Sequence, residues 1–138
     1  MKIYVTGLGV VSGIGIGVSE NIEALRQRKH GIGKVTLFPT ALDVPVSEVK
    51  RSNEELKKLI SLPPQRTVSR TALLGMIAAE EAMKDAGLTP SLRIGFISAT
   101  SVGGMDLSEH FYESFKKNPG QGRLREVISH DCGASTEL

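Results

Sequence analysis

The sequence predicts an α/β fold, and three adjacent segments carry that prediction. Residues 67–87 form the longest strongly patterned stretch, in which Ser69 suits an N-cap and Gly87 suits a C-terminal stop. The first half of this stretch is apolar on nearly every side, so we expect it to be buried while the polar end surfaces. Residues 92–99 are typical of a buried strand, and a glycine turn at 101–104 follows. A helix, a short turn, a buried strand and a glycine turn in succession are the building units of α/β proteins.

The helix predicted at 67–87 also carries a series of small residues. They are Gly75, Ala78, Ala79, Ala82 and Ala86. Since none of them has a bulky side chain, we expect a sheet or a second helix to approach this helix closely.

Composition limits the classes of protein that this chain can represent. Its 138 residues suffice for one modest domain, and 40% hydrophobic with 23% charged residues suits a globular chain. Lysine and arginine number 17 against 15 acidic residues, and this net charge of +2 is too small to argue for nucleic-acid binding. A single cysteine excludes an internal disulfide framework and fits a reducing cytosol. The chain opens without a long apolar run, so we expect neither a signal peptide nor a membrane span.

A strand expected at 2–8 leads into a glycine-rich loop. Its glycines are Gly7, Gly9, Gly13, Gly15 and Gly17. A dinucleotide fingerprint needs a third glycine in G-x-G-x-x-G and a helix that opens directly on the pyrophosphate. Ser12 occupies the place of that glycine, and a helix is expected only from Ser19, so a structural glycine turn is the favoured interpretation. A Rossmann-like nucleotide-binding module stays open as an alternative from another class.

The remaining predicted elements are three helices and two short β-like runs. The helices are expected at 20–28, 53–60 and 106–117, and the β-like runs at 35–38 and 43–49 indicate an exposed ribbon. Ser19 is the predicted N-cap of the first of these helices. On the last helix, Leu107, Phe111 and Phe115 recur at helical spacing, which is more typical of core packing than of cofactor contact.

The segment before the helix at 67–87 is locally basic. Its cations are Lys50, Arg51, Lys57, Lys58, Arg66 and Arg70. Charge alone favours a solvated face. The alternative is a docking patch for an acidic partner, because complementary charge steers the encounter of two proteins.

The last residues carry nucleophile-like side chains without a catalytic arrangement. His130 and Cys132 are too close in sequence to face each other on a helix, and no third group is visible to orient them. Residues 133–138 have the pattern of a helix cap and first turn with no helix behind it. We therefore expect a single partial domain over 1–138, cut before its fold is complete, whose exposed apolar surface other polypeptide covers.

Three segments together carry a resemblance to a known family. Residues 5–12 (VTGLGVVS), followed by Gly15, resemble the opening of the chain-elongating β-ketoacyl-acyl-carrier-protein synthases. Residues 69–87 resemble the first long helix of that family, and residues 93–98 running into 102–105 (VGGM) resemble its next strand and glycine loop. The three matches occur in the family's order and spacing and cover most of 1–105.

The resemblance implies a fold, a reaction and partners. The implied fold is the N-terminal part of a thiolase-like, layered α-β-α structure with an incomplete sheet, usually in a homodimer. The implied reaction is decarboxylative Claisen condensation, in which an acyl group on a cysteine is attacked by the carbanion that malonyl-carrier protein forms. The family places that cysteine in an elbow at a helix N-terminus, where the helix dipole favours the thiolate, and it uses two later histidines. Asp131, Cys132 and Gly133 do not match the elbow, so we expect no catalytic residue, and no cofactor or metal, in this chain.

Two minor site roles follow from the resemblance by position. Val102, with Gly103 and Gly104, matches the place where the family puts the end of its acyl pocket. Arg66 matches a basic position that meets the acidic acyl carrier protein. Two alternatives stay open beside an elongating synthase: a non-catalytic partner like a chain-length factor, and an interaction domain whose basic segment binds an acidic protein.

Overall fold

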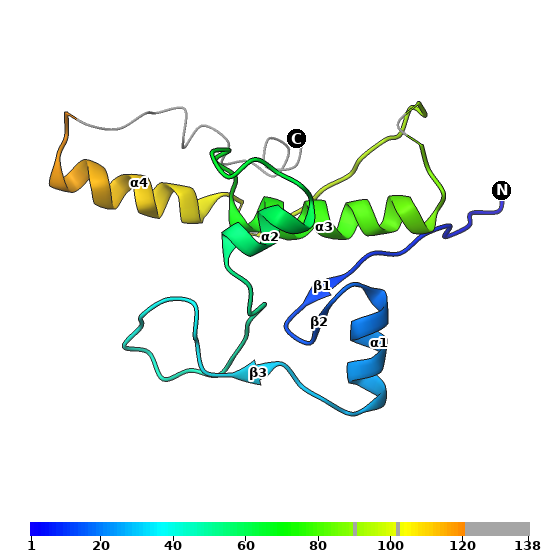
Figure 1. Ribbon diagram of the computed structural model, residues 1–138, viewed down its shortest axis with the longest axis horizontal. Coiled ribbons are helices and arrows are strands. Elements are labelled where there is room, and N and C mark those ends of the chain that lie inside the picture. The colour runs from blue at the N-terminus through cyan, green and yellow to red at the C-terminus, as the bar shows by residue number, and fades with distance from the viewer. Residues whose placement is uncertain (90, 102, 121–138) are drawn as a thin grey trace.

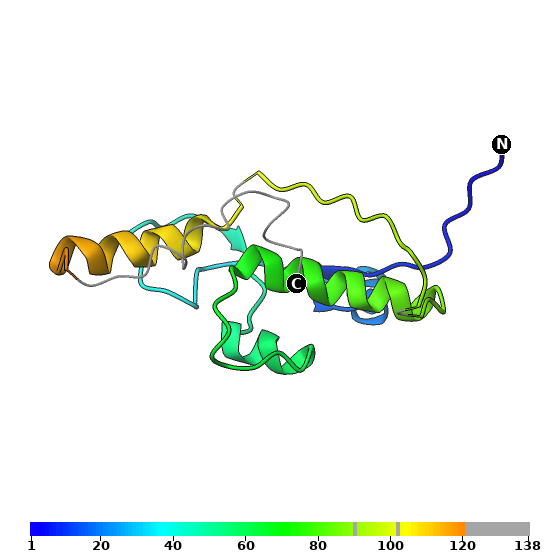
Figure 2. The same cartoon turned by 90° about the horizontal axis from the view of Figure 1, so that it is seen from above.

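The structure is a computed structural model that describes residues 1–89, 91–101 and 103–120 (Figure 1). In chain order its elements are β1 (Val11–Ser12), β2 (Gly15–Ile16), α1 (Val18–Arg26), β3 (Ile32–Gly33), β4 (Val46–Ser47), α2 (Asn53–Leu59), α3 (Arg70–Asp85) and α4 (Met105–Lys117). The figures show α3 and α4 nearly end to end along the long axis, with their N-termini facing each other (Figures 1 and 2).

Helix α3 is the element predicted at 67–87, and its ends follow the sequence signals. The Ser69 hydroxyl accepts a hydrogen bond from the Ala72 N–H at 3.1 Å, which satisfies one free donor of the first turn. Gly87 has a φ of 64°, the left-handed conformation that ends a helix. Leu73 and Ile77 are buried in the first half of α3, as its apolar composition predicts.

The hydrophobic core lies where α2 packs against α3. Leu56 of α2 and Leu73 of α3 are fully buried, and Val68, Ala72 and Ile77 complete the buried cluster. The start of α2 is fixed by a capping box, in which the Ser52 hydroxyl accepts from the Glu55 N–H and the Glu55 carboxylate accepts from the Ser52 N–H. That backbone donor lowers the pKa of the Glu55 carboxyl below its ordinary value.

The N-terminal segment crosses α3 at very close range. A Cβ placed on Gly9 would overlap the carbonyl oxygen of Ala78, and one placed on Gly7 would overlap that of Ala82. Two carboxylates of α3 reach the same segment: Asp85 accepts from the Leu8 N–H at 2.9 Å, and Glu81 from the Val10 N–H at 3.0 Å. The close approach predicted from the small residues of the helix is therefore confirmed, although an extended chain makes it.

Within the described residues, strand pairing is limited to two separate two-stranded sheets with two residues per strand. β1 pairs antiparallel with β2, and β3 with β4. Residues 2–8 and 92–99 are in no strand, so both predictions of strands are wrong for the described structure. Strand formation requires a neighbour that accepts and donates backbone hydrogen bonds, and none borders them within the described residues. Their apolar side chains stay exposed; Ile97 is 97% accessible to solvent.

Three further expectations need correction. The N-cap of α1 is Gly17, with a φ of 95°, and Ser19 lies inside the helix. The β-like runs at 35–38 and 43–49 contribute only Val46–Ser47, which pairs with Ile32–Gly33. Helix α4 has no buried residue, so the interpretation of its aromatic spacing as core packing is wrong; Phe111 and Phe115 stack on each other instead, with ring centroids 5.8 Å apart.

Candidate functional site

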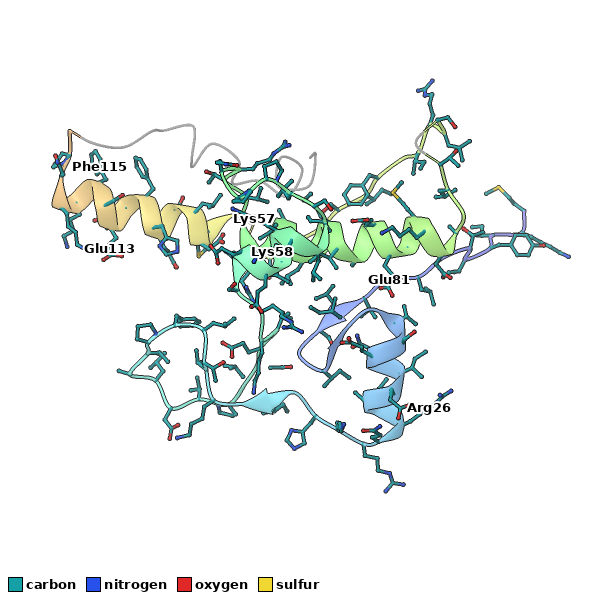
Figure 3. The ribbon with its side chains drawn as sticks, in the orientation of Figure 1. Arg26, Lys57, Lys58, Glu81, Glu113 and Phe115 are labelled. Carbon is teal, nitrogen blue, oxygen red and sulfur yellow. The ribbon has the colours of Figure 1, made fainter. Side chains whose placement is uncertain are left out.

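A basic surface lies at the end of α2 and in the loop before α3. We define it as Lys57, Lys58 and Arg66; Figure 3 labels the two lysines. Lys58 and Arg66 are exposed. The Lys57 ammonium donates to the carbonyl oxygen of Pro64 at 2.9 Å and so ties α2 to this loop. The N–H of Arg66 donates to the Pro63 carbonyl at 3.0 Å, which folds the loop into a turn. The two exposed cations, Lys58 and Arg66, thus lie on segments that the Lys57–Pro64 hydrogen bond holds together.

Two other cations of the predicted basic segment have structural partners. The Arg70 guanidinium donates to the carbonyl oxygens of Val49 (2.6 Å) and Arg51 (2.9 Å), and to the Asn53 side-chain oxygen (2.9 Å). Arg51 forms an exposed ion pair with Glu55 at 3.3 Å. Arg70 therefore anchors the chain before α2, and the basic surface is smaller than the sequence suggests.

The second predicted site consists of Val102, Gly103 and Gly104. Its two glycines form a buried turn before α4. Gly103 has a φ of 56°, a conformation that favours glycine, and its N–H donates to the Thr100 hydroxyl at 3.2 Å. Gly104 is the N-cap of α4, and its carbonyl accepts from the Leu107 N–H at 3.0 Å. Val102, the third predicted residue of this site, lies outside the described residues.

Asp106 joins the glycine turn to the start of α3. It lies in the first turn of α4, and its Oδ2 accepts from the Arg70 N–H, the first N–H of α3, at 2.7 Å. The positive ends of both helix dipoles favour a carboxylate at this position. Its other oxygen, Oδ1, is buried and has no hydrogen-bond partner among the described residues. Asp106 therefore connects the two helices at the point where their N-termini meet.

Carboxylates bind two N–H groups where the glycine-rich loop meets the start of α1. The Val18 N–H donates to Glu81 Oε1 at 2.7 Å, and the Ile16 N–H donates to Glu20 Oε2 at 2.8 Å. The buried Asn21 amide donates to the carbonyls of Gly15 and Gly17. Carboxylates thus occupy the place where a dinucleotide's pyrophosphate would bind, and this geometry favours the structural interpretation of the glycines.

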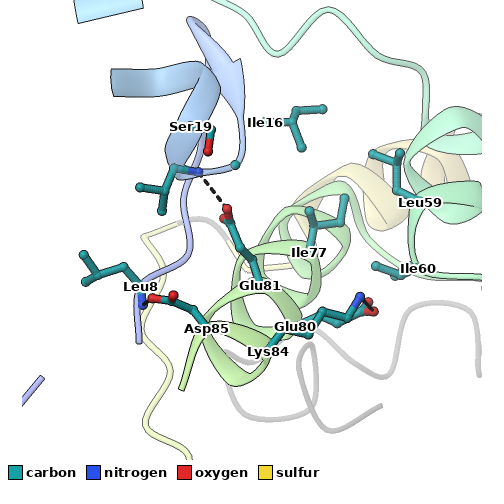
Figure 4. A pocket seen from close by; sticks show the side chains of 12 residues that line it. Leu8, Ile16, Ser19, Leu59, Ile60, Ile77, Glu80, Glu81, Lys84 and Asp85 are labelled. Atoms are coloured by element: carbon teal, nitrogen blue, oxygen red, sulfur yellow. Dashed lines mark hydrogen bonds and ion pairs between the residues drawn. The ribbon is translucent and has the colours of Figure 1, made fainter. Parts of the chain in front are cut away.

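An open groove of about 480 Å³ separates this loop from the end of α2 (Figure 4). Ile16, Leu59 and Ile77 give it an apolar floor, and charged side chains of α3, including Glu80 and Lys84, form its rim. These two charges pair with each other at 2.5 Å. The groove coincides neither with the basic surface nor with the Gly103–Gly104 turn.

Two classes of feature are absent from the described part of the chain. Residues 1–89, 91–101 and 103–120 contain no group of three His, Cys, Asp or Glu side chains placed to hold a metal ion. Within the same residues, no helix has the length and apolar character needed to cross a membrane. His130 and Cys132 lie outside the described residues.

The fold and the sequence together define the class of protein. The family model described as the N-terminal domain of β-ketoacyl synthases matches residues 1–135, and the chain belongs to this family. A solved structure, the ishigamide ketosynthase/chain length factor, aligns over 94% of this chain with a TM-score of 0.74 and 27% sequence identity. The fold is therefore the N-terminal part of a thiolase-like structure with an incomplete sheet, as the resemblance implies.

Two relatives are similar in sequence to most of this chain. It is 30% identical over 122 residues to 3-oxoacyl-[acyl-carrier-protein] synthase 2 of Coxiella burnetii, covering 82% of this chain and 28% of that protein. It is 28% identical over 128 residues to nodulation protein E of Rhizobium meliloti, covering 86% of this chain and 30% of that protein. The chain thus spans about a third or less of the proteins that it matches.

Sequence reasoning missed the acidic residues that hold the structure together. Glu81 and Asp85 appear in the sequence as the polar, surfacing end of a helix, but they bind backbone N–H groups of the first 18 residues. Asp106 appears only as the first residue of a predicted helix. An acidic residue in the first turn of a predicted helix suits the positive end of that helix dipole, but the sequence does not reveal which second helix it meets.

Proposed function

We propose that this chain is the N-terminal segment of an elongating 3-oxoacyl-[acyl-carrier-protein] synthase. The observation that carries the proposal is the family match over residues 1–135, supported by the relative from Coxiella burnetii that bears this activity in its name. The whole protein would condense an acyl thioester with malonyl-carrier protein in fatty acid or related biosynthesis. It would work in the cytoplasm as a homodimer, and the 138 residues alone would be inactive because the nucleophilic cysteine and the two histidines would lie in later segments.

The acyl carrier protein is the proposed partner, and the basic surface is its proposed docking site. Arg66 and Lys58 are exposed and form no ion pair with an acidic side chain in the described part of the chain, while Lys57 braces the loop that presents Arg66. An acidic carrier protein would be steered to this surface by long-range attraction. Gly103 and Gly104, with Val102 beside them, would form the end of the pocket that receives the acyl chain.

Charge reversal tests the docking site. Arg66→Glu combined with Lys58→Glu should weaken binding of the acyl carrier protein by about tenfold, mainly through slower association, and the loss should shrink at high salt. Lys29→Glu is the matched control, because it reverses an exposed cation beyond the end of α1. Titration calorimetry or surface plasmon resonance provides the measurement. Equal affinities for the double variant and the control would show that Arg66 and Lys58 do not form the docking site.

A second candidate is a non-catalytic partner of the chain-length-factor type. One observation favours it: a solved structure similar to this chain is a ketosynthase/chain length factor. Incubating the polypeptide that carries this segment with a labelled acyl thioester separates the two candidates. A synthase should acquire label on a cysteine beyond residue 138, and that label should be released by hydroxylamine; a chain-length factor should acquire none.

A further inference from the structure

A carboxylate links the Gly103–Gly104 turn to the N-terminus of α3. Helix α4 has no buried residue, so apolar packing contributes little to its placement within the described structure. A specific contact between its first turn and α3 is the 2.7 Å hydrogen bond from the Arg70 N–H to Asp106 Oδ2. Only Met105 separates Asp106 from the turn, so a displacement of the Asp106 backbone moves Gly104 with it.

The α3 side of this contact is rigid. Ser69 caps the helix, and the first turn packs into the core through Ala72 and Leu73, which are 1% and 0% exposed. The Arg70 side chain makes three hydrogen bonds, two to the chain before α2 and one to Asn53 at its start. Asp106 is therefore bonded to one of the most firmly held backbone positions of the molecule.

Side-chain rearrangement cannot change the shape of the Gly103–Gly104 turn, because neither residue has a side chain. Gly103 is in the left-handed region, both glycines are buried, and neither has a side chain, so any wall that this turn forms consists of backbone. A wall made of backbone moves only when the chain moves. The position of such a wall depends on the contacts at its two ends. These contacts are the hydrogen bond to the Thr100 hydroxyl on one side and the hydrogen bond of Asp106 on the other.

We propose that Asp106 is a positioning residue that holds the Gly103–Gly104 turn against the N-terminus of α3 and thereby sets which acyl-chain lengths the enzyme accepts. This inference rests on the proposed function, in which the turn forms the end of the acyl pocket. Releasing Asp106 lets the pocket end move outward, so longer acyl chains gain relative to shorter ones.

The test uses the full polypeptide that carries this chain and measures kcat/KM for a short and a long acyl-carrier substrate. Asp106→Ala should change the long-to-short ratio about tenfold or more, since a single methylene in an apolar pocket is worth about 10- to 200-fold in discrimination. Asp106→Asn should restore the ratio to within about twofold, because its amide oxygen still accepts the Arg70 N–H. Asp85→Ala is the matched control, since it also removes a carboxylate that accepts a backbone N–H, but at the far end of α3.

Each outcome decides between the possibilities. A changed ratio in Asp106→Ala, rescued in Asp106→Asn and absent in Asp85→Ala, supports the inference. An equal loss for both substrates, with lower thermal stability and an unchanged ratio, overturns it and leaves the proposed function intact. A wild-type polypeptide that acylates and condenses no substrate overturns the proposed function, and this inference with it.

Discussion

Gly9 illustrates how single residues fix the arrangement of the N-terminal segment. The backbone of Gly9 lies against the carbonyl of Ala78, and a carboxylate of the same helix, Glu81, binds the neighbouring Val10 N–H. This contact needs both residues. Gly9 has no side chain to keep the two backbones apart, and the Glu81 side chain is long enough to reach the Val10 N–H. Glycine is needed at position 9 because the two backbones lie so close together, and no phosphate ligand is required to explain why this residue is a glycine.

The space around Gly9 leads to a prediction for its replacement. Gly9→Ala should destabilise the protein by about 1–3 kcal/mol, because the new methyl group overlaps backbone that cannot rotate away. Gly33→Ala is the matched control, since a Cβ there meets nothing within 4 Å. Urea denaturation gives the free energies of unfolding. A Gly9→Ala protein as stable as the Gly33→Ala protein would show that the segment does not cross α3 this closely.

At the scale of elements, local signals predict helices far better than strands. The caps at Ser69 and Ser52 lie within one turn of the N–H groups that they bind, so the sequence contains both partners of each contact. A strand depends on a distant partner that the local pattern does not identify, which is why residues 2–8 and 92–99 have strand composition and no ladder. For the same reason, the link between Asp106 and Arg70, 36 positions apart, could not be predicted from the sequence. Arg66 is singled out by its position in the family resemblance, and its docking role stays a prediction.

The two candidate caps in the sequence allow a paired test. Ser69→Ala should cost about 0.5–2 kcal/mol of stability, since it leaves the Ala72 N–H of α3 without its acceptor. Ser19→Ala should cost less than about 0.5 kcal/mol, because Ser19 is an exposed residue inside α1 and caps nothing. Thermal or chemical denaturation measures both. A larger loss for Ser19→Ala would restore Ser19 as the cap of α1.

The loop between β3 and β4 should respond to acid. The Glu48 carboxylate accepts from the Thr36 hydroxyl at 2.5 Å and from the Thr36 and Leu37 N–H groups at 3.0 to 3.1 Å. The Thr36 side chain is the main cause of a Glu48 pKa below its ordinary value of 4.5. Because the folded pKa is lowered, these bonds stabilise the loop fully above the ordinary pKa and are lost as pH falls through the lowered value.

Amide NMR signals of Thr36 and Leu37 measure this loss. Their chemical shifts should change together with a midpoint below pH 4.5, the ordinary value for this carboxyl. Glu48→Gln serves as the control, and its spectra should lack the transition. A midpoint above 4.5 in the wild type would contradict the assigned contacts.

At the scale of the whole molecule, the core is too small to bury the chain's apolar residues. Among the residues that the structure describes, six hydrophobic residues are buried, whereas Ile3, Val5, Phe96 and Ile97 are each more than half exposed. Eight exposed large hydrophobic residues lie in the two segments with strand composition that lack a ladder, four in residues 2–8 and four in residues 92–99. We propose that further polypeptide of the same protein pairs with these segments, which agrees with a chain that spans about a third or less of its relatives.

Condensation of malonyl-carrier protein with an acyl thioester, followed as carbon dioxide release, tests the central claim most directly. The 138-residue chain should show no turnover above the background, and the longer polypeptide that carries it should form the 3-oxoacyl product. Turnover by the 138-residue chain that Cys132→Ala abolishes would contradict the account, because the catalytic nucleophile would then lie within this segment.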